Sequence, residues 1–121
     1  MTAIIVISHG SHSPKTKVEV EQLVRKLKQT TPFEIVEYAF LEIEKPSIPE
    51  AIKQSVERGA KKIIILLNFL NSGKHVDEDI PKMINAATRE YPFVKFQITK
   101  PVGQHPKIPE LFLDLLKKSL S

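Results

Sequence analysis

Residues 63–81 read Ile-Ile-Ile-Leu-Leu-Asn-Phe-Leu-Asn-Ser-Gly-Lys-His-Val-Asp-Glu-Asp-Ile-Pro. The first five form the most apolar run in the chain, which is typical of a parallel strand buried on both faces. A polar loop containing His75 follows, and apolar residues then recur at helical spacing from Ile80. This order of strand, loop and helix predicts an α/β fold, whose chemistry lies in loops at the carboxyl ends of parallel strands.

The same order of strand and helix occurs four times along the chain. Residues 3–7 and 63–67 are continuously apolar, whereas residues 34–41 and 94–99 include polar positions. Continuously apolar strands belong in the middle of a sheet, and mixed strands belong at its edges. We therefore predict a four-stranded parallel sheet in the order 2-1-3-4, with right-handed crossovers and helices on both faces.

Four helices are predicted from apolar residues spaced three and four positions apart. Ser13 and Pro14 suit the start of the first helix, and Pro106 opens the last. The Ser-x-x-Glu pattern from Ser47 to Glu50 is a capping box for the second. The apolar stripes are Val20, Leu23, Val24 and Leu27; Ile48, Ala51, Ile52 and Val56; Ile80, Met83, Ile84 and Ala87; and Ile108, Leu111, Phe112, Leu115 and Leu116.

The composition is that of an ordinary globular chain, with 121 residues, 41% hydrophobic residues and 26% charged residues. We expect a single domain over residues 1–121, because no linker or repeat divides it. Neither a membrane-length apolar run nor a basic secretory region is present, so we expect a soluble, cytoplasmic protein without a membrane partner. The net charge of +4 favours acidic partners, but the lysines are scattered, which argues against a nucleic-acid patch.

The chain contains no cysteine. Disulfides, thiol nucleophiles and cysteine-ligated metals are therefore excluded, and histidine and carboxylate side chains remain as metal ligands. Ser8 and Ser11 lie near His9 but lack the Gly-x-Ser-x-Gly pattern of a nucleophile elbow. The glycines match neither a Walker loop nor a dinucleotide fingerprint.

The predicted topology brings all four histidines to one edge of the sheet. His9 and His12 follow the first strand, Glu42 the second, His75 the third and His105 the fourth. Taken singly, each histidine has a structural explanation, such as a hydrogen bond to loop carbonyls or a helix cap. The combination of His9, Glu42 and His75 instead favours a site that binds a divalent metal or takes up protons near neutral pH.

Several short motifs follow one another in order along most of the chain. They are Ser8-His9-Gly10-Ser11, Phe40-Leu41-Glu42, Pro46-Ser47-Ile48, Phe69-Leu70, Gly73, His75, Asp79-Ile80-Pro81, Val102-Gly103 and His105-Pro106. Together these motifs resemble the small, single-domain sirohydrochlorin cobaltochelatases of the class II chelatase family. Histidine stands at two characteristic positions of that family, but His12 and Asn68 depart from its usual arginine and proline.

The resemblance implies a chelatase-like fold and a lyase-type metal chelatase activity. The enzyme would insert a divalent metal, most often Co²⁺ and alternatively Ni²⁺ or Fe²⁺, into the metal-free tetrapyrrole sirohydrochlorin. This reaction belongs to cobalamin or sirohaem-type biosynthesis and uses no organic cofactor. The family's essential histidines fall on His9 and His75 and its glutamate on Glu42. These residues would deliver the metal and accept the pyrrole protons.

The resemblance also suggests how substrate is held. Candidate substrate-binding residues are Ser11, His12, Ser72, Gly73 and Lys74, with Lys74 placed to meet a substrate carboxylate. A tetrapyrrole is broader than the edge of one such domain, so a two-fold homodimer is expected to enclose it. Two alternatives remain at this point: a metal or tetrapyrrole carrier without catalysis, and a receiver-like or nucleotide-binding α/β domain.

Overall fold

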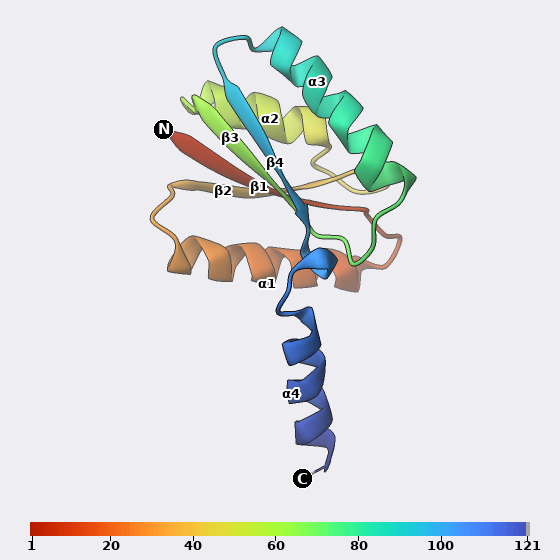
Figure 1. The fold of residues 1–121 in the computed structure, drawn as a ribbon. Coiled ribbons are helices and arrows are strands. Elements are labelled where there is room, and N and C mark those ends of the chain that lie inside the picture. The colour runs from red at the N-terminus through yellow and green to blue at the C-terminus, as the bar shows by residue number, and fades with distance from the viewer. Residues whose placement is uncertain (121) are drawn as a thin grey trace.

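The computed structural model describes residues 1–120 and has one parallel sheet (Figure 1). Its strand order is β2-β1-β3-β4, as predicted, and every neighbouring pair is parallel. Strands β2 and β4, which include polar residues, are at the edges because only the central strands are apolar enough for burial on both sides. The strands are β1 (Thr2–Ser8), β2 (Ile35–Phe40), β3 (Lys62–Leu67) and β4 (Lys95–Pro101).

Helices cover the two faces of the sheet unequally. Helix α1 (Pro14–Thr30) lies on one face, and α2 (Ile48–Glu57) and α3 (Ile80–Glu90) lie on the other (Figure 1). The larger core lies beneath α2 and α3, where alternate residues of β1 and β3 meet the two apolar stripes. A smaller core lies beneath α1 and contains Val20 and Val24. The α1 face is therefore only partly covered.

Local sequence explains where the helices begin. Helix α2 has the predicted capping box: the Glu50 amide donates to Ser47 Oγ, and the Ser47 amide donates to Glu50 Oε1. Ser13 occupies the N-cap position of α1, as expected, but its side chain makes no capping hydrogen bond. Gly59 follows α2 with a positive φ of 101°.

The segment around His75 differs from the prediction. It was expected to be a loop, but residues His75–Asp79 form a π-helical turn, η1, that runs directly into α3. The backbone amide of Ile80 donates to the His75 carbonyl, which closes the wide turn. Isolated π-helical turns are frequent at functional sites because they redirect side chains within a helix.

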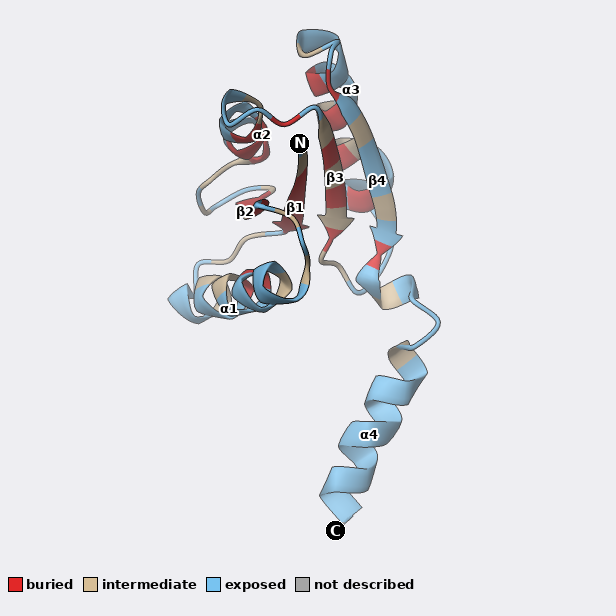
Figure 2. Cartoon of the chain, turned by 90° about the vertical axis from the view of Figure 1, so that its left-hand side faces the viewer, coloured by how far each residue is buried: buried red, intermediate tan, exposed pale blue. Residues whose placement is uncertain are grey.

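The last helix also departs from the prediction. Helix α4 (Ile108–Leu120) was expected to complete the helical cover of the sheet, but it projects away from it, and none of its residues is buried (Figure 2). A short 3₁₀ helix, η2 (Val102–Gln104), connects it to β4. None of the helices within residues 1–120 is both long and apolar enough to cross a membrane.

Candidate functional site: a histidine and glutamate cluster

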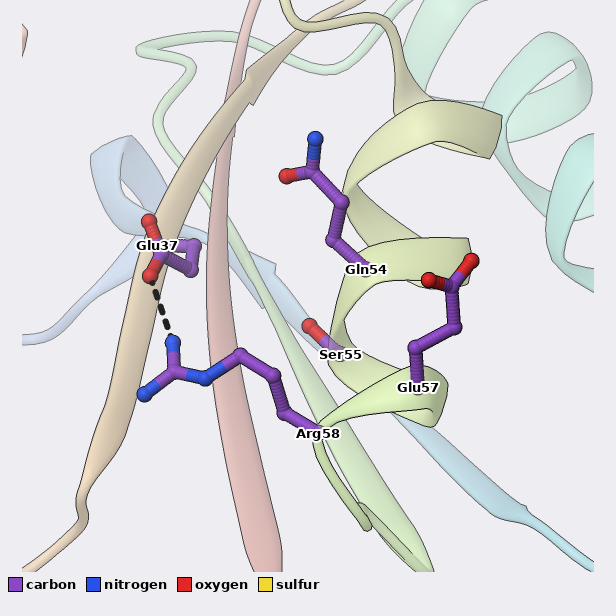
Figure 3. Close-up of a pocket in the computed structure, with 5 residues that line it drawn as sticks. All are labelled: Glu37, Gln54, Ser55, Glu57 and Arg58. Carbon is purple, nitrogen blue, oxygen red and sulfur yellow. Dashed lines mark hydrogen bonds and ion pairs between the residues drawn. The ribbon is translucent and has the colours of Figure 1, made fainter.

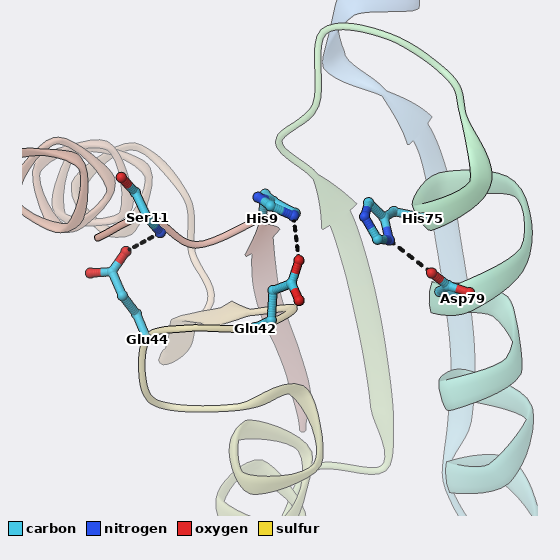
Figure 4. Close-up of polar contacts among 6 residues, drawn as sticks. All are labelled: His9, Ser11, Glu42, Glu44, His75 and Asp79. Carbon is cyan, nitrogen blue, oxygen red and sulfur yellow. Dashed lines mark hydrogen bonds and ion pairs between the residues drawn. The ribbon is translucent and has the colours of Figure 1, made fainter. Parts of the chain in front are cut away.

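Three segments deliver the candidate residues to the carboxyl edge of the sheet. His9 follows β1, Glu42 follows β2, and His75 opens the π-helical turn beyond β3 (Figure 4). One potential ligand atom from each of these residues lies within 4.8 Å of the others. All three residues are exposed. The structure therefore brings together the three side chains that were predicted to act jointly.

His9 and Glu42 form the tightest contact of the cluster. His9 Nε2 lies 2.6 Å from Glu42 Oε1, and both side chains are about half exposed. The backbone supports this pairing, since the Leu41 amide donates to the Ser8 carbonyl and the Glu42 amide donates to the His9 carbonyl. The hydrogen-bond pattern of β1 and β2 thus continues beyond the strands and sets Glu42 beside His9.

Gly10 permits the close approach of these two segments. Its φ is +104°, and a Cβ atom at this position would lie 1.9 Å from the Glu42 carbonyl oxygen. Only glycine combines this backbone conformation with so little space. The glycine between His9 and Ser11 therefore has a structural role in the cluster, which its place in the motif did not reveal.

His75 is held from its other side by Asp79. His75 Nδ1 lies 2.7 Å from Asp79 Oδ2, one helical turn further along the chain (Figure 4). A carboxylate on one imidazole nitrogen fixes the tautomer and ring orientation, and leaves the other nitrogen available to a metal. The sequence prediction missed this role because His75 was assigned to a loop, although the four-residue spacing was visible.

The two imidazoles face each other across the end of β3. Their ring centroids are 5.1 Å apart, and the ring planes are inclined by 39°. Ligand atoms that bind one ion at about 2.1 Å lie at most about 4.2 Å apart, so small side-chain rotations would gather the three residues on one metal. Three protein ligands leave further coordination positions open to another molecule, as in catalytic metal sites.

Asn68 anchors the start of the loop beyond β3. Its amide donates to the Ile7 carbonyl, and its side-chain nitrogen donates to Ser8 Oγ at 3.0 Å. Ser8 is buried, so this contact also satisfies a polar group next to His9. Asn68 departs from the proline of the motif, but here it fastens the end of the third strand to the end of the first, next to His9.

The other predicted residues are placed differently. The Ser11 amide donates to Glu44 Oε1 (Figure 4). The Ser11 hydroxyl accepts from the Ser13 amide. The Ser72 hydroxyl accepts from the Gln104 side chain. The residues outside the three-residue cluster are Ser11, His12, Ser72, Gly73, Lys74 and His105.

His105 has the structural role of a helix start. Its Nδ1 accepts from the Lys107 amide, and its carbonyl accepts from the Ile108 amide. These contacts are those of a residue that caps the first turn of α4. The structural explanation considered for this histidine therefore applies.

A separate cavity of about 430 Å³ lies between β2 and the end of α2 (Figure 3). Its Arg58 Nη1 lies 3.0 Å from Glu37 Oε1, and the Ser55 hydroxyl donates to the Ala51 carbonyl. Gln54 and Glu57 complete the lining. No histidine contributes to the lining, and the arginine and serine are already paired, so the histidine cluster is the stronger candidate site.

Comparisons with known proteins place the chain in a family. The model of the CbiX family matches residues 3–119 of this chain. The chain belongs to the CbiX family. This family assignment confirms the resemblance found in the sequence, and removes the receiver-like alternative.

The relatives of this chain differ in length. A sirohydrochlorin cobaltochelatase from Methanopyrus kandleri is 30% identical over 140 aligned residues, which cover 99% of this chain and 98% of that protein. The chloroplastic sirohydrochlorin ferrochelatase of Arabidopsis thaliana is 33% identical over 98% of this chain, but the match covers only 52% of the plant protein. The chain thus spans about half the length of some relatives.

Two solved structures share the fold of this chain. A putative cobalamin biosynthesis CbiX protein from Marinobacter aquaeolei superposes with a TM-score of 0.86 at 24% identity, covering 99% of this chain and 95% of that one. The sirohydrochlorin chelatase SirB of Bacillus subtilis, in complex with cobalt, gives 0.88 at 26% identity, covering 97% of this chain and 50% of SirB. The predicted chelatase-like fold is therefore confirmed.

Proposed function

We propose that this CbiX-family chain is a sirohydrochlorin chelatase that inserts a divalent metal into the metal-free tetrapyrrole. The convergence of His9, Glu42 and His75 within 4.8 Å at an exposed edge carries this proposal. Relatives named as sirohydrochlorin cobaltochelatases support both the tetrapyrrole substrate and cobalt as the metal. Co²⁺ is therefore the first metal to test, followed by Fe²⁺ and Ni²⁺, since imidazole suits all three.

The three residues have complementary roles in this proposal. His75, oriented by Asp79, offers an imidazole nitrogen to the incoming metal. His9 Nε2 and Glu42 Oε1 share a hydrogen bond, and a metal that binds either of these two atoms would displace the proton between them. Metal insertion displaces two pyrrole protons, and imidazole accepts protons near neutral pH. The metal is a substrate here, and the proposal includes no organic cofactor.

Substrate binding would involve the surrounding edge of the sheet. Lys74 and His12 are exposed and can meet substrate carboxylates, which favourable charge would attract. The hydroxyls of Ser11 and Ser72 already accept hydrogen bonds, so these residues would contribute their remaining donor capacity. Gly73 would allow close approach of the substrate, because nothing lies within 4 Å of its hypothetical Cβ.

The proposed active species is a cytoplasmic homodimer, in which each chain forms a single domain. This chain corresponds to 50% of the SirB chain, so two copies match the length of that chelatase. The three residues of the cluster are exposed, and a second copy would help to enclose a broad tetrapyrrole over them.

The proposal is tested by following the visible absorption of sirohydrochlorin with Co²⁺, with and without the protein. We expect the protein to accelerate insertion, and His9→Ala or His75→Ala to reduce the rate by about 100-fold or more, as expected when a general base or metal ligand is removed. Both variants should keep the wild-type circular dichroism spectrum, because the two side chains are exposed.

Asp77→Ala is the matched control, since Asp77 is exposed on the same turn as His75 but lies outside the cluster. Wild-type rates in both histidine variants would overturn the proposed mechanism. Binding of metal and sirohydrochlorin without acceleration would instead support the alternative function, a carrier.

A further inference from the structure

The turn that follows Glu42 has a strained backbone. The Glu44 amide donates to the Glu42 carbonyl at 2.8 Å, and Ile43 between them has a φ of +72°. A hydrogen bond across three residues with a positive φ at the central one is typical of the rarer and more strained form of the γ-turn. Within residues 1–120, Ile43 is the only residue other than glycine with a positive φ.

The side chain of Ile43 does little to offset this strain. Isoleucine is branched at Cβ, and such residues are crowded at positive φ, so glycine or asparagine is usual at such a position. Ile43 is 50% exposed, which means that half of its side chain gains nothing from burial. A strained residue persists only where the surrounding contacts fix its conformation, and such residues are concentrated at functional sites.

Backbone contacts fix the turn on two sides. The Phe40 amide donates to the Pro46 carbonyl at 2.9 Å, which closes the loop at its base. The Glu42 amide donates to the His9 carbonyl at 3.1 Å, and the Glu42 carbonyl occupies the space that a side chain at Gly10 would need. These contacts hold the first half of the turn but not the half beyond Ile43.

The Glu44 carboxylate holds the second half of the turn. Its Oε1 accepts from the Ser11 amide at 2.8 Å, in a partly buried contact between residues 33 positions apart. A carboxylate that accepts from a backbone amide makes a stronger hydrogen bond than two neutral groups do. The contact therefore ties the far side of the turn to the segment that follows β1.

Glu42 and Glu44 hold the same segment from one loop. Figure 4 shows both carboxylates reaching toward the residues after β1, with Glu42 at the His9 ring and Glu44 at the backbone of Ser11. The γ-turn at Ile43 joins the two carboxylates. Relaxation of this turn would therefore move Glu42 relative to His9.

We propose that Glu44 is a positioning residue of the metal site. By accepting the Ser11 amide, it holds the strained turn at Ile43 closed and keeps Glu42 paired with His9. This role rests on the proposed function, in which His9 and Glu42 belong to the site. It complements that of Asp79, which contacts His75 at the other end of the cluster.

Titration with Co²⁺ alone tests this role by calorimetry. Glu44→Ala should weaken Co²⁺ binding by about 10-fold or more, as loss of an outer hydrogen-bond partner of a metal ligand usually does. Glu44→Gln keeps an oxygen that can accept the Ser11 amide, and should bind Co²⁺ within about 3-fold of wild type. Asp77→Ala is the control, because it removes a carboxylate from the turn of His75 and lies outside the cluster.

A second variant tests whether the strain at Ile43 is what Glu44 restrains. Glycine adopts a positive φ without steric cost, so Ile43→Gly should relieve the turn. We expect Ile43→Gly alone to keep wild-type Co²⁺ affinity. Combined with Glu44→Ala, it should recover at least about 3-fold of the lost affinity, because the turn no longer tends to open.

Three results would overturn the role of Glu44. Wild-type affinity in Glu44→Ala would show that the contact with Ser11 does not arrange the site. Equal losses in Glu44→Ala and Glu44→Gln would assign the effect to charge, and no recovery with Ile43→Gly would show that the turn is not under the proposed restraint.

Failure of this role and failure of the proposed function can be told apart. In each of the three cases above, a chelatase rate that His75→Ala still abolishes would leave the proposed function standing. If Glu44→Ala loses Co²⁺ affinity as expected, but the wild-type protein does not accelerate metal insertion, the chelatase is wrong and the role of Glu44 in metal binding stands.

Discussion

His75 is oriented by a single carboxylate, that of Asp79. The contact is 2.7 Å long and joins Nδ1 to the carboxylate, so the remaining nitrogen, Nε2, is the one that can bind metal. Asp79 does not belong to the three-residue cluster itself. It is a positioning residue, and its effect should appear in metal affinity more than in folding.

Asp79→Asn should weaken Co²⁺ binding by about 10- to 100-fold, the usual effect of losing an outer hydrogen-bond partner of a ligating histidine. The measurement is a titration with Co²⁺ alone, followed by calorimetry. Asp77→Asn is the control, because it removes the same charge from the same turn without touching His75. Equal affinities in the two variants would show that Asp79 does not orient the ring.

Gly10 connects backbone conformation to the same site. Gly10→Ala should strain the backbone by about 1–2 kcal/mol, because φ is positive there, and should also push the Glu42 carbonyl away. We expect lower stability in urea together with at least 10-fold weaker Co²⁺ binding.

Gly59→Ala separates these two effects. Its φ of +101° carries a similar strain, but nothing lies within 4 Å of the added methyl group. This variant should lose stability and keep wild-type metal affinity. If Gly10→Ala also kept wild-type affinity, the close packing against Glu42 would have no part in arranging the site.

At the scale of elements, α2 shows how a local signal stabilises the fold. Ser47 and Glu50 satisfy each other's backbone amides at the start of the helix, and Ile48 and Ile52 then enter the larger core. Ser47→Ala should lower the free energy of unfolding by about 1 kcal/mol, as loss of a serine cap usually does. Urea unfolding at pH 7 checks this, with the exposed Lys53→Ala on the same helix as the control.

The capping box also predicts a pH dependence. The hydrogen bonds with the Ser47 backbone and side chain lower the pKa of Glu50 from its ordinary value of 4.5. The stabilisation from the ionised carboxylate is therefore present above that value and is lost as the pH falls through the lower, folded-state pKa. Glu50→Gln should thus lose stability relative to wild type at pH 7 and approach wild type in acid. A constant difference at all pH values would contradict this origin.

At the scale of the whole molecule, the net charge of +4 favours an anionic substrate. Lys74 lies beyond the carboxyl ends of the strands, where the histidines are. Lys95 is the first residue of β4 and lies at the amino ends of the strands. Lys74→Ala should raise KM for sirohydrochlorin several-fold at low salt, with a smaller effect near 0.5 M salt because of screening. Lys95→Ala should leave KM unchanged. Identical salt profiles for the two variants would argue that overall charge alone attracts the substrate.

Much of the fold followed from local patterns. The continuous apolar runs of β1 and β3 predicted their central places, and the mixed strands β2 and β4 were correctly assigned to the edges. The capping box and the buried stripes of α2 and α3 were also confirmed. These features can be predicted because burial on one or both sides of a helix or strand requires apolar residues at a regular spacing along it.

Only part of the candidate site could be predicted from the sequence. Parallel strands end at one edge, so His9, Glu42 and His75 could be predicted to share it, and the structure places them together. The π-helical turn and the pairing of His75 with Asp79 could not be predicted from a motif that looked like a loop. The roles of these residues in metal insertion stay predictions until the variants are measured.

The order of the strands, the apolar face of each helix and the edge on which the histidines meet could be predicted from local sequence, because each depends on periodicity and chain direction. The distances within the cluster could not, since they depend on how Gly10 and Asn68 fasten neighbouring segments in the folded chain. The tertiary structure also decided the direction of α4. An apolar stripe records that a helix will be covered, but it carries no information on whether the covering surface belongs to the same chain.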